Sequence, residues 1–304
     1  MNQNVLVSII VLTYKDFSGL EKTMNAILEQ NYPHIEIIVG DDGSPNYSEK
    51  FFDAFIDRAK RQNISLIIRH NEHNLGTVKN INEALKLAHG HIIGFLGCGD
   101  YYASRDVIKN IVNCFEKNDA EVVTTKMKGI SVSNPNRITI LPHKKFCKLL
   151  KEGNNKRLLS KMFNDNCFCA PATFYKRTVY EKYGIYDERM RLIEDYPFLF
   201  NLVLKGAKIK FLDICTVIYL FDGVSSGKAS PMILDDLEKI RRLVLFPYID
   251  ECMPRERRLF LYNFYRKQSD NLQGKVKTAL KYPDQFIYWQ YRRVVSFFQV
   301  RLRR

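Results

Sequence analysis

The sequence predicts an α/β protein built on a mixed, mainly parallel sheet flanked by helices. Two nearly continuous apolar runs, 5–14 and 35–44, end in polar or acidic residues and flank a helix-like segment. Runs without polar alternation are typical of parallel strands buried on both faces. Ligands bind beyond the carboxyl ends of such strands, so acids at these ends are candidate site residues.

Strand and helix patterns alternate through the first hundred residues. Leu20, Met24 and Leu28 recur at spacings of four, which predicts a helix over 19–30 between the first two strands. We then expect a helix over 48–61, a strand over 64–68, a glycine-containing loop and helix over 71–90, and a buried strand over 92–96. This alternation favours a doubly wound or related parallel α/β sheet.

The second half of the chain has a more mixed pattern. We expect strands near 208–212 and 216–220, and a helical, basic region from Asp235 onward with a break at Tyr282-Pro283. The chain is therefore expected to hold an α/β domain over 1–228 and a basic α-helical region over 229–304.

Composition limits the class of protein. The 304 residues, 46% of them hydrophobic, suffice for one large domain with an appendage or for two small domains. The first residues lack a basic lead, so we expect no signal peptide, and no run approaches the roughly 20 apolar residues that cross a bilayer. The seven scattered cysteines predict free thiols in a reducing cytoplasm, because Cys167 and Cys169 alone are a weak zinc pattern.

The formal charge of +14 is concentrated near the C-terminus. Residues 254–304 contain thirteen Lys or Arg residues and three acidic residues, so the formal charge of this region is +10. Part of this region predicts an amphipathic basic helix with one apolar face: Ile287, Tyr291, Val294, Val295, Phe298 and Leu302. Such a helix either binds an anionic membrane surface or docks on the protein, and a basic tail also suits nucleic acid or an acidic glycan.

The polar motifs reduce the number of enzyme classes that the chain could belong to. There is no Gly-x-Gly-x-x-Gly after the first strand and no Gly-x-x-x-x-Gly-Lys-Ser/Thr, which argues against dinucleotide oxidoreductases and P-loop phosphotransferases. The chain instead carries Thr13-Tyr14, Asp41-Asp42-Gly43-Ser44, Asn74-Leu-Gly76 with Lys79-Asn80, then Asp100 and Glu194-Asp195. In this order and at these separations the motifs resemble the family 2 glycosyltransferases, inverting enzymes with the Rossmann-like GT-A fold. The resemblance covers about residues 5–226.

The resemblance implies a nucleotide-diphosphate sugar donor, taken here as UDP-linked. Asp42 matches the acid that reads the uracil edge, a charge-assisted hydrogen bond, and Thr13 and Tyr14 line the same pocket. The other residues assigned to the donor site by this resemblance are Asp41, Gly76, Lys79, Asn80, Cys98 and Gly99. Taken alone, Asp41-Asp42-Gly43-Ser44 also suits an ordinary turn.

The resemblance also implies a divalent metal, Mg²⁺ or Mn²⁺, that neutralises the donor diphosphate. Relatives carry an Asp-x-Asp at the exit of this strand, whereas Gly97-Cys98-Gly99-Asp100 keeps only the last acid. Asp100 is therefore the expected metal ligand, and the glycines let the backbone approach the phosphates. The alternative is that Asp100 only caps the following turn.

Inverting transfer is a single displacement that needs a general base for the acceptor hydroxyl. Glu194-Asp195 matches the acidic pair of the family, which assigns Asp195 as base and Glu194 as its orienting neighbour. Acids at a helix N-terminus are also favoured by electrostatics alone. Residues 221–226 are similar to a loop that closes over donor phosphates, although a plain turn explains them equally well.

These residues predict a glycosyltransferase that extends a glycan or polyprenyl-linked acceptor in capsule, lipopolysaccharide or exopolysaccharide synthesis. We expect it in the cytoplasm or at the inner face of the cell membrane, held there by the C-terminal basic helices, with no nucleic acid partner. Two alternatives stay open. One is a nucleotide-sugar-binding relative with altered catalysis, suggested by Gly97 and Gly99, and the other is a nucleic-acid-binding protein that uses the basic tail.

Overall fold

A computed structural model of the chain describes residues 5–221, 230–269 and 271–291. The chain divides into two compact units, one formed by 1–155 and 167–240 and the other by 156–166 and 241–304. The division of function between a catalytic domain over 1–228 and a helical region over 229–304 stays a prediction.

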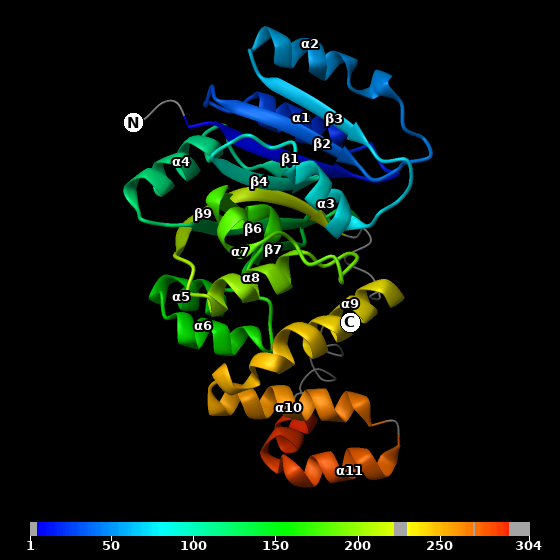
Figure 1. Cartoon of the computed structure of the whole chain (residues 1–304), viewed down its shortest axis with the longest axis vertical. Helices are drawn as coiled ribbons and strands as arrows, with labels where there is room; N and C mark the ends of the chain where they lie inside the picture. The colour runs from blue at the N-terminus through cyan, green and yellow to red at the C-terminus, as the bar shows by residue number, and fades with distance from the viewer. Residues whose placement is uncertain (1–4, 222–229, 270, 292–304) are drawn as a thin grey trace. The chain divides into compact units, whose positions relative to one another are not determined.

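One mixed sheet forms the centre of the first unit (Figure 1). In the described residues its strand order is β3-β2-β1-β4-β8-β6-β9-β5, with β7 paired to β6, and β3, β2, β1 and β4 run parallel. The strands are β1 (Val7–Thr13), β2 (Ile35–Asp41), β3 (Ser65–His70), β4 (Ile92–Gly97), β5 (Tyr101–Tyr102), β6 (Val122–Ser131), β7 (Ile138–Leu141), β8 (Thr173–Lys176) and β9 (Ile209–Phe221). The predicted mixed α/β sheet is confirmed.

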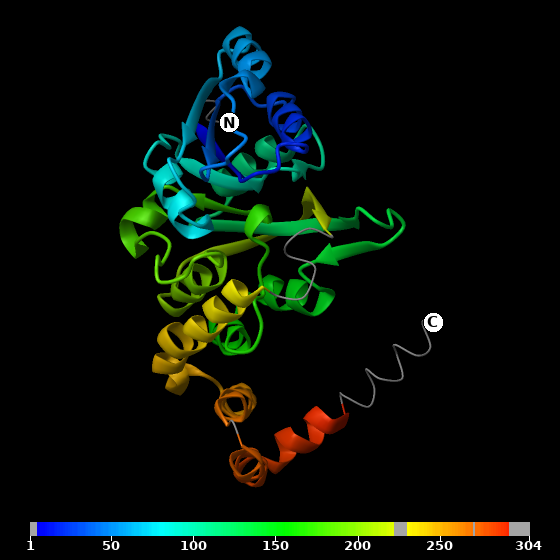
Figure 2. The same cartoon turned by 90° about the vertical axis from the view of Figure 1, so that its right-hand side faces the viewer.

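Helices cover both faces of this sheet (Figure 2). Those of the first unit are α1 (Leu20–Leu28), α2 (Asp53–Arg61), α3 (Thr77–Leu85), α4 (Val107–Lys117), α5 (Lys144–Glu152), α7 (Thr178–Tyr183), α8 (Asp195–Leu204) and α9 (Pro231–Lys239). Short 3-10 turns lie at Glu49–Phe51 and Ala170–Ala172. The first of these splits the helix predicted over 48–61, so that α2 begins only at Asp53.

Strand β1 shows why the apolar runs lack alternation. Ile9 and Val11 join a core cluster with Met24 and Ile27 of α1, whereas Ile10, equally buried, lies outside that cluster. Successive side chains of a strand point to opposite faces, so both faces of β1 are covered. The prediction of a strand buried on both sides is confirmed.

The register brings the strand ends together at one edge. Thr13 pairs with Asp41, Leu12 pairs with Gly97, and Asp41 pairs with His70. Because β1, β2, β3 and β4 are parallel, the motifs that follow them in the sequence all leave the sheet on the same side.

The two strands predicted near 208–212 and 216–220 are one continuous strand, β9, so that prediction is wrong. The pairing of β9 with β6 slips between Thr124 and Lys126, where Phe211 and Cys215 are the flanking partners. The extra residues, 212–214, form a bulge that keeps the strand continuous while re-aiming its side chains. A bulge interrupts the hydrophobic pattern as a loop does, which is why the sequence suggested a gap.

The second unit is helical. It contains α6 (Asn155–Met162), a π-helical turn (Ile240–Leu245), a 3-10 segment (Phe246–Glu251), α10 (Pro254–Gln268) and α11 (Leu272–Lys281). The rings of Phe163 and Phe260 pack edge to face 5.6 Å apart, and Asn164 Nδ2 donates to Glu256. Helix α11 ends before Tyr282 and a helix resumes at Pro283, which confirms the predicted break.

None of the helices within the described ranges has the length and apolar character needed to span a bilayer. The apolar face predicted from Val294 onward lies outside the described residues, as does most of the loop at 221–226. Membrane attachment through the C-terminal region therefore stays a prediction.

A buried acid near the amino ends of the parallel strands, away from the edge where the motifs lie, gives a test of the fold. Glu36 accepts hydrogen bonds from Ser8 Oγ and from the backbone N–H groups of His89 and Gly90. Burial alone would raise the pKa of Glu36, but these hydrogen bonds outweigh it and lower the pKa. A carboxylate with a lowered pKa stabilises the fold above its unfolded pKa of about 4.3, and this contribution is lost as the pH falls further.

We therefore predict that the free energy of unfolding, measured by urea titration at a series of pH values, falls more steeply in acid for the wild type than for Glu36→Gln. The exposed acid Glu21 provides the control, since Glu21→Gln should keep the wild-type slope. Parallel slopes for the wild type and Glu36→Gln would contradict this account.

Candidate active site

The carboxylate of Asp42 holds the loop that precedes α3. Its Oδ1 accepts from Leu75 N at 2.8 Å, and its Oδ2 accepts from Gly76 N at 2.9 Å and from Asn74 Nδ2 at 2.7 Å. A fourth donor, Asn71 Nδ2, lies 3.1 Å from Oδ1. Asp42 is only 4% exposed, so these bonds compensate most of the cost of burying its charge.

The amides of this loop continue the network into the sheet. Asn71 Nδ2 also donates to Asn80 Oδ1, and Asn80 Nδ2 donates to the carbonyl of Gly40 at 2.9 Å. The predicted site residue Asn80 is thus buried and ties α3 to β2. Lys79, its neighbour on α3, is exposed.

Asp41 is fully buried beside Asp42 and has different partners. Its carboxylate accepts from Ser44 N and Oγ and lies 2.6 Å from His70 Nδ1, and the Tyr47 ring stacks on His70 at 4.0 Å. Asp41 and its partners therefore hold the turn after β2, and the ring of Tyr47 lies over the end of β3.

The end of β1 lies beside the exit of β4. Thr13 is buried, Tyr14 is exposed, and the N–H of Asp42 donates to the carbonyl of Thr13. Burial raises the pKa of the Cys98 thiol to about 11, although a hydrogen bond with Thr13 opposes this shift. Three of the predicted donor residues, Thr13, Asp42 and Cys98, are therefore in one neighbourhood.

Asp100 is a buried carboxylate at the exit of β4. Burial raises its pKa to about 7, against hydrogen bonds with the backbone of Gly97 and Leu220. Beside it, Gly99 has a φ of +103°, which favours glycine, and no atom would lie within 4 Å of an added Cβ. Gly99 thus leaves open space next to the acid, whereas Gly97 lies against the carboxylate itself, because an added Cβ there would be 3.3 Å from Asp100 Oδ2.

These features bear on the expected metal. In the described part of the chain, no group of three or more His, Cys, Asp or Glu side chains is arranged to hold an ion. Mg²⁺ and similar ions are often held by one or two carboxylates together with substrate phosphates and waters. A buried carboxyl that has no ion pair with any described residue, next to the open side of Gly99, fits an ion that arrives with a diphosphate.

The acidic pair lies at the start of the buried helix α8. Asp195 is its first residue and Glu194 is the N-cap, as the sequence predicted for a helix N-terminus. Burial, then the neighbouring charge of Asp195 and the charge of Asp236, raise the pKa of Glu194. Further along α8, the ring of Phe198 stacks on the ring of Tyr180 with centroids 5.4 Å apart.

Another buried carboxylate, Asp236 of α9, holds the segment before the pair. It accepts from the backbone N–H groups of three consecutive residues: Arg191 at 2.9 Å, Leu192 at 2.6 Å and Ile193 at 3.0 Å. Asp236 is fully buried. The backbone leading into Glu194 and Asp195 is thus fixed by one charged acceptor.

Arg191 joins the two sides of the site. Its guanidinium donates to Asn74 Oδ1 at 2.6 Å, and its carbonyl accepts from Val78 N. Gly76, with φ of +89°, passes so close that an added Cβ would lie 2.6 Å from Arg191 Cγ. Gly76 is therefore needed where the Asp42 loop meets the segment before the acidic pair.

Sequence reasoning did not single out Asp236, Arg191 or Asn71. Asp236 lies 42 residues after Glu194 in a segment that reads as an ordinary amphipathic helix, so no local pattern indicated it. Asn71 and Arg191 lie next to residues of the recognised motifs. Only their positions near those motifs could have drawn attention to them.

Comparison with known proteins gives the family. The sequence model of glycosyl transferase family 2 matches residues 8–184, more than half of the chain. The uncharacterized glycosyltransferase EpsJ of Bacillus subtilis is 27% identical over 225 residues, which cover 70% of this chain and 60% of EpsJ. This chain therefore spans about three fifths of the length of that relative.

Solved structures of glycosyltransferases share the fold. S. aureus TarS 1–349 in complex with UDP-GlcNAc superposes with a TM-score of 0.63 at 20% identity, over 91% of this chain and 80% of the other. The mannosyltransferase PcManGT of Pyrobaculum calidifontis, with GDP-Man and Mn²⁺, gives 0.57 at 16% identity, over 96% and 84%. The predicted GT-A architecture is thereby confirmed.

The Asp42 network predicts a specific loss of stability. Asparagine offers one acceptor oxygen and an NH₂ group that would face N–H donors, so Asp42→Asn should lower the free energy of unfolding by about 1 to 3 kcal/mol. The exposed Asp57 of α2 supplies the control variant, Asp57→Asn. Equal stability of the two variants in urea titrations would show that the network carries little energy.

The negative charge of Asp236 near Glu194 gives a prediction for the pKa of Glu194. Replacing Asp236 by Asn removes a negative charge near Glu194, so the pKa of Glu194 should fall toward its ordinary value. The measurement is a carbon NMR titration of the Glu194 carboxyl group. The control is Asp235→Asn, in the neighbouring exposed residue, which should leave the pKa of Glu194 unchanged. An unchanged titration curve in Asp236→Asn would show that the charge of Asp236 does not act on Glu194.

Proposed function

The chain belongs to glycosyl transferase family 2, and we propose that it transfers a sugar from a nucleotide-diphosphate donor to an acceptor hydroxyl. One observation carries the proposal. Asp42 and Asp100 follow the parallel strands β2 and β4, which pair with opposite sides of β1, and Arg191 connects the Asp42 loop to the segment that leads into Glu194 and Asp195. The acids expected to bind the donor are thereby connected to the acids expected to bind the acceptor.

The donor is a UDP-sugar in this proposal. TarS, which shares the fold, was solved with UDP-GlcNAc, whereas PcManGT holds GDP-Man, so the fold accommodates different bases. The exposed Tyr14 and the buried Thr13 lie beside the Asp42 loop, where polar groups and a ring suit a base. Lys79, exposed on α3, is a cation available to the diphosphate.

Asp100 holds a divalent ion, Mg²⁺ or Mn²⁺, in this proposal. When bound, the ion neutralises charge on the departing nucleotide diphosphate. PcManGT, solved with Mn²⁺, supports a metal in this fold. The chain itself contributes the buried Asp100 carboxylate and the open backbone at Gly99, which lets phosphate oxygens come close.

The reaction is a single displacement with inversion at the anomeric carbon. The acceptor oxygen forms its bond to that carbon as the bond to the nucleotide diphosphate breaks on the opposite face, and Asp195 takes the hydroxyl proton. Glu194, with its raised pKa, keeps a proton more readily than an exposed carboxyl and so can donate a hydrogen bond beside the base.

The acceptor is a glycan or a lipid-linked glycan in the synthesis of a cell-surface polysaccharide. The resemblance to EpsJ and TarS supports bacterial glycan synthesis at the level of the family. We place the reaction in the cytoplasm or at the inner face of the cell membrane.

The general base gives the decisive variant. Asp195→Asn keeps the shape of the side chain and removes the proton acceptor, so release of UDP from UDP-GlcNAc should fall by about 10²- to 10⁴-fold. Binding of UDP, measured by the shift in melting temperature, should be retained.

Glu181→Gln, in an exposed acid of α7, is the matched control and should keep both activity and UDP binding. A wild type that binds UDP but releases none from any UDP-sugar would favour the alternative of a donor-binding relative with altered catalysis. Full activity of Asp195→Asn would remove Asp195 from the mechanism.

A further inference from the structure

A strongly basic cavity lies between α5 and the strands β6, β7 and β9. Its volume is about 880 Å³, and five of its lining side chains are lysines: Lys126, Lys144, Lys145, Lys148 and Lys151. Asp213 is the one acid in the lining. With five cations against one anion, the cavity has a formal charge of +4.

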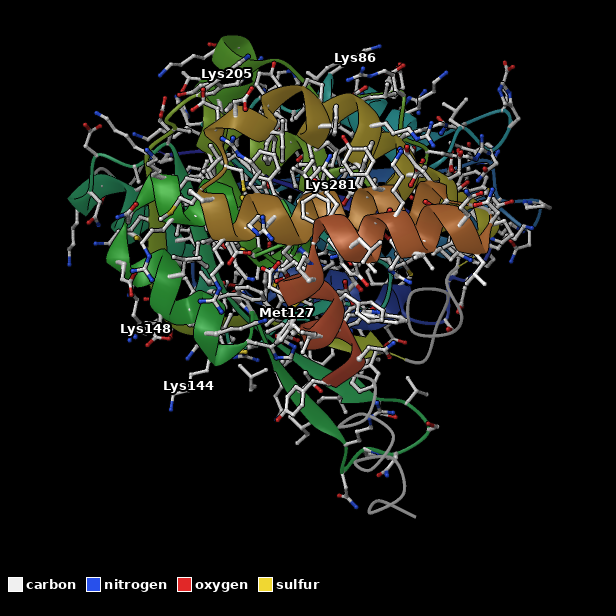
Figure 3. The ribbon with its side chains drawn as sticks, turned by 90° about the horizontal axis from the view of Figure 1, so that it is seen from below. Lys86, Met127, Lys144, Lys148, Lys205 and Lys281 are labelled. Atoms are coloured by element: carbon white, nitrogen blue, oxygen red, sulfur yellow. The ribbon has the colours of Figure 1, made fainter. Side chains whose placement is uncertain are left out.

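The sequence of α5 places lysines along one face. Phe146, Leu149 and Leu150 are buried against the domain. Lys144, Lys148 and Lys151 recur at spacings of four and three, which puts them in one row along the helix. Figure 3 shows Lys144 and Lys148 next to each other, well apart from Lys86 and Lys205.

The bulge of β9 brings the acid to this row. Asp213 lies among the extra residues of the bulge and pairs with Lys126 at 2.8 Å and with Lys151 on α5. A hydrogen bond to Asp213 raises the pKa of Lys126, which keeps this lysine charged. The described residues give Lys144 and Lys148 no carboxylate partner, so their charges are left for a ligand.

Two interactions connect the lining of the cavity with the side of the domain that carries the acidic pair. Lys126 follows Thr125, whose hydroxyl donates to the carbonyl of Ala172 at 3.1 Å, just after Cys169. Burial, and then the nearby Asp195 carboxylate and Cys147 thiol, raise the pKa of the Cys169 thiol. Cys147 lines the cavity, so Cys169 is within electrostatic range of both the base and the cavity.

We propose that the lysine cavity binds a phosphate or diphosphate group of the acceptor, which makes the acceptor anionic. This inference rests on the proposed function, because it assigns the anion to the substrate whose hydroxyl faces Asp195. The donor phosphates are already assigned to Asp100 and the glycines at the exit of β4. Clustered ammonium groups are suited to phosphate, which is a compact, multiply charged anion.

The first test measures binding of inorganic diphosphate by isothermal titration calorimetry. The full chain is saturated with UDP in the presence of EDTA, so that diphosphate does not occupy the donor site. The double variant Lys144→Gln/Lys148→Gln should weaken binding by about tenfold or more, because two charge-assisted contacts are lost. The matched control, Lys86→Gln/Lys205→Gln, removes two exposed lysines elsewhere on the same unit and should leave the affinity unchanged.

Equal weakening in both double variants, or no binding of diphosphate by the wild type, would overturn the proposal. Sedimentation with phosphatidylcholine vesicles, with or without phosphatidic acid, separates the sources of the phosphate. Sedimentation that needs both phosphatidic acid and the two lysines supports a lipid-linked acceptor. Lysine-dependent binding of diphosphate without sedimentation supports a soluble phosphorylated glycan.

The same variants separate this inference from the proposed function. Lys144→Gln/Lys148→Gln should keep the melting-temperature shift caused by UDP, since these lysines lie outside the donor residues. If the wild type shows no response to any nucleotide, the donor proposal fails, and the assignment of the anion to an acceptor falls with it.

Discussion

Two buried carboxylates that collect backbone N–H groups hold the rest of the site in place. Asp42 holds the loop at 71–76 and Asp236 holds the segment at 191–193, and the N–H groups that donate to them belong to residues outside the helices and the sheet. Buried N–H groups need partners, and a carboxylate offers two oxygens with several acceptor positions. Without these two acids the loops would have no fixed path between the sheet and the acidic pair.

The Asp41-Asp42 motif therefore has a structural role, which is to fix the neighbouring loops, in addition to any contact with a nucleotide. Asp42 already has four donors within the protein, so a base would approach a carboxylate that is occupied and fixed in place. A fixed acceptor loses little entropy when a ligand binds, which is the advantage of a preorganised site. Arg191 bonds to Asn74 of the same loop and so links it to the segment before the helix that begins at Asp195.

The parallel strands and the motifs at their ends were readable from the sequence because both are local. The apolar runs lack the polar alternation of half-exposed strands, which is typical of buried parallel strands, and parallel pairing then brings Asp42 and Asp100 to one edge of the sheet. Asp236 was not readable, since its partners lie more than forty residues earlier and its own segment looks like a solvated helix. The lysines of α5 have the same difficulty, because only the bulge at 212–214 and the strand β6 turn that row into the wall of a cavity.

Native-state hydrogen exchange of individual amides tests the central claim that buried carboxylates hold the two loops. Amides that bond to Asp42 and Asp236 should exchange as slowly as amides of β1, although they lie in loops: Leu75, Gly76, Arg191, Leu192 and Ile193. Slow exchange of this kind reports opening at high free energy. Exchange of these five amides at the rate of the exposed loop residues Glu72 and His73 would show that the loops open freely and would contradict the account.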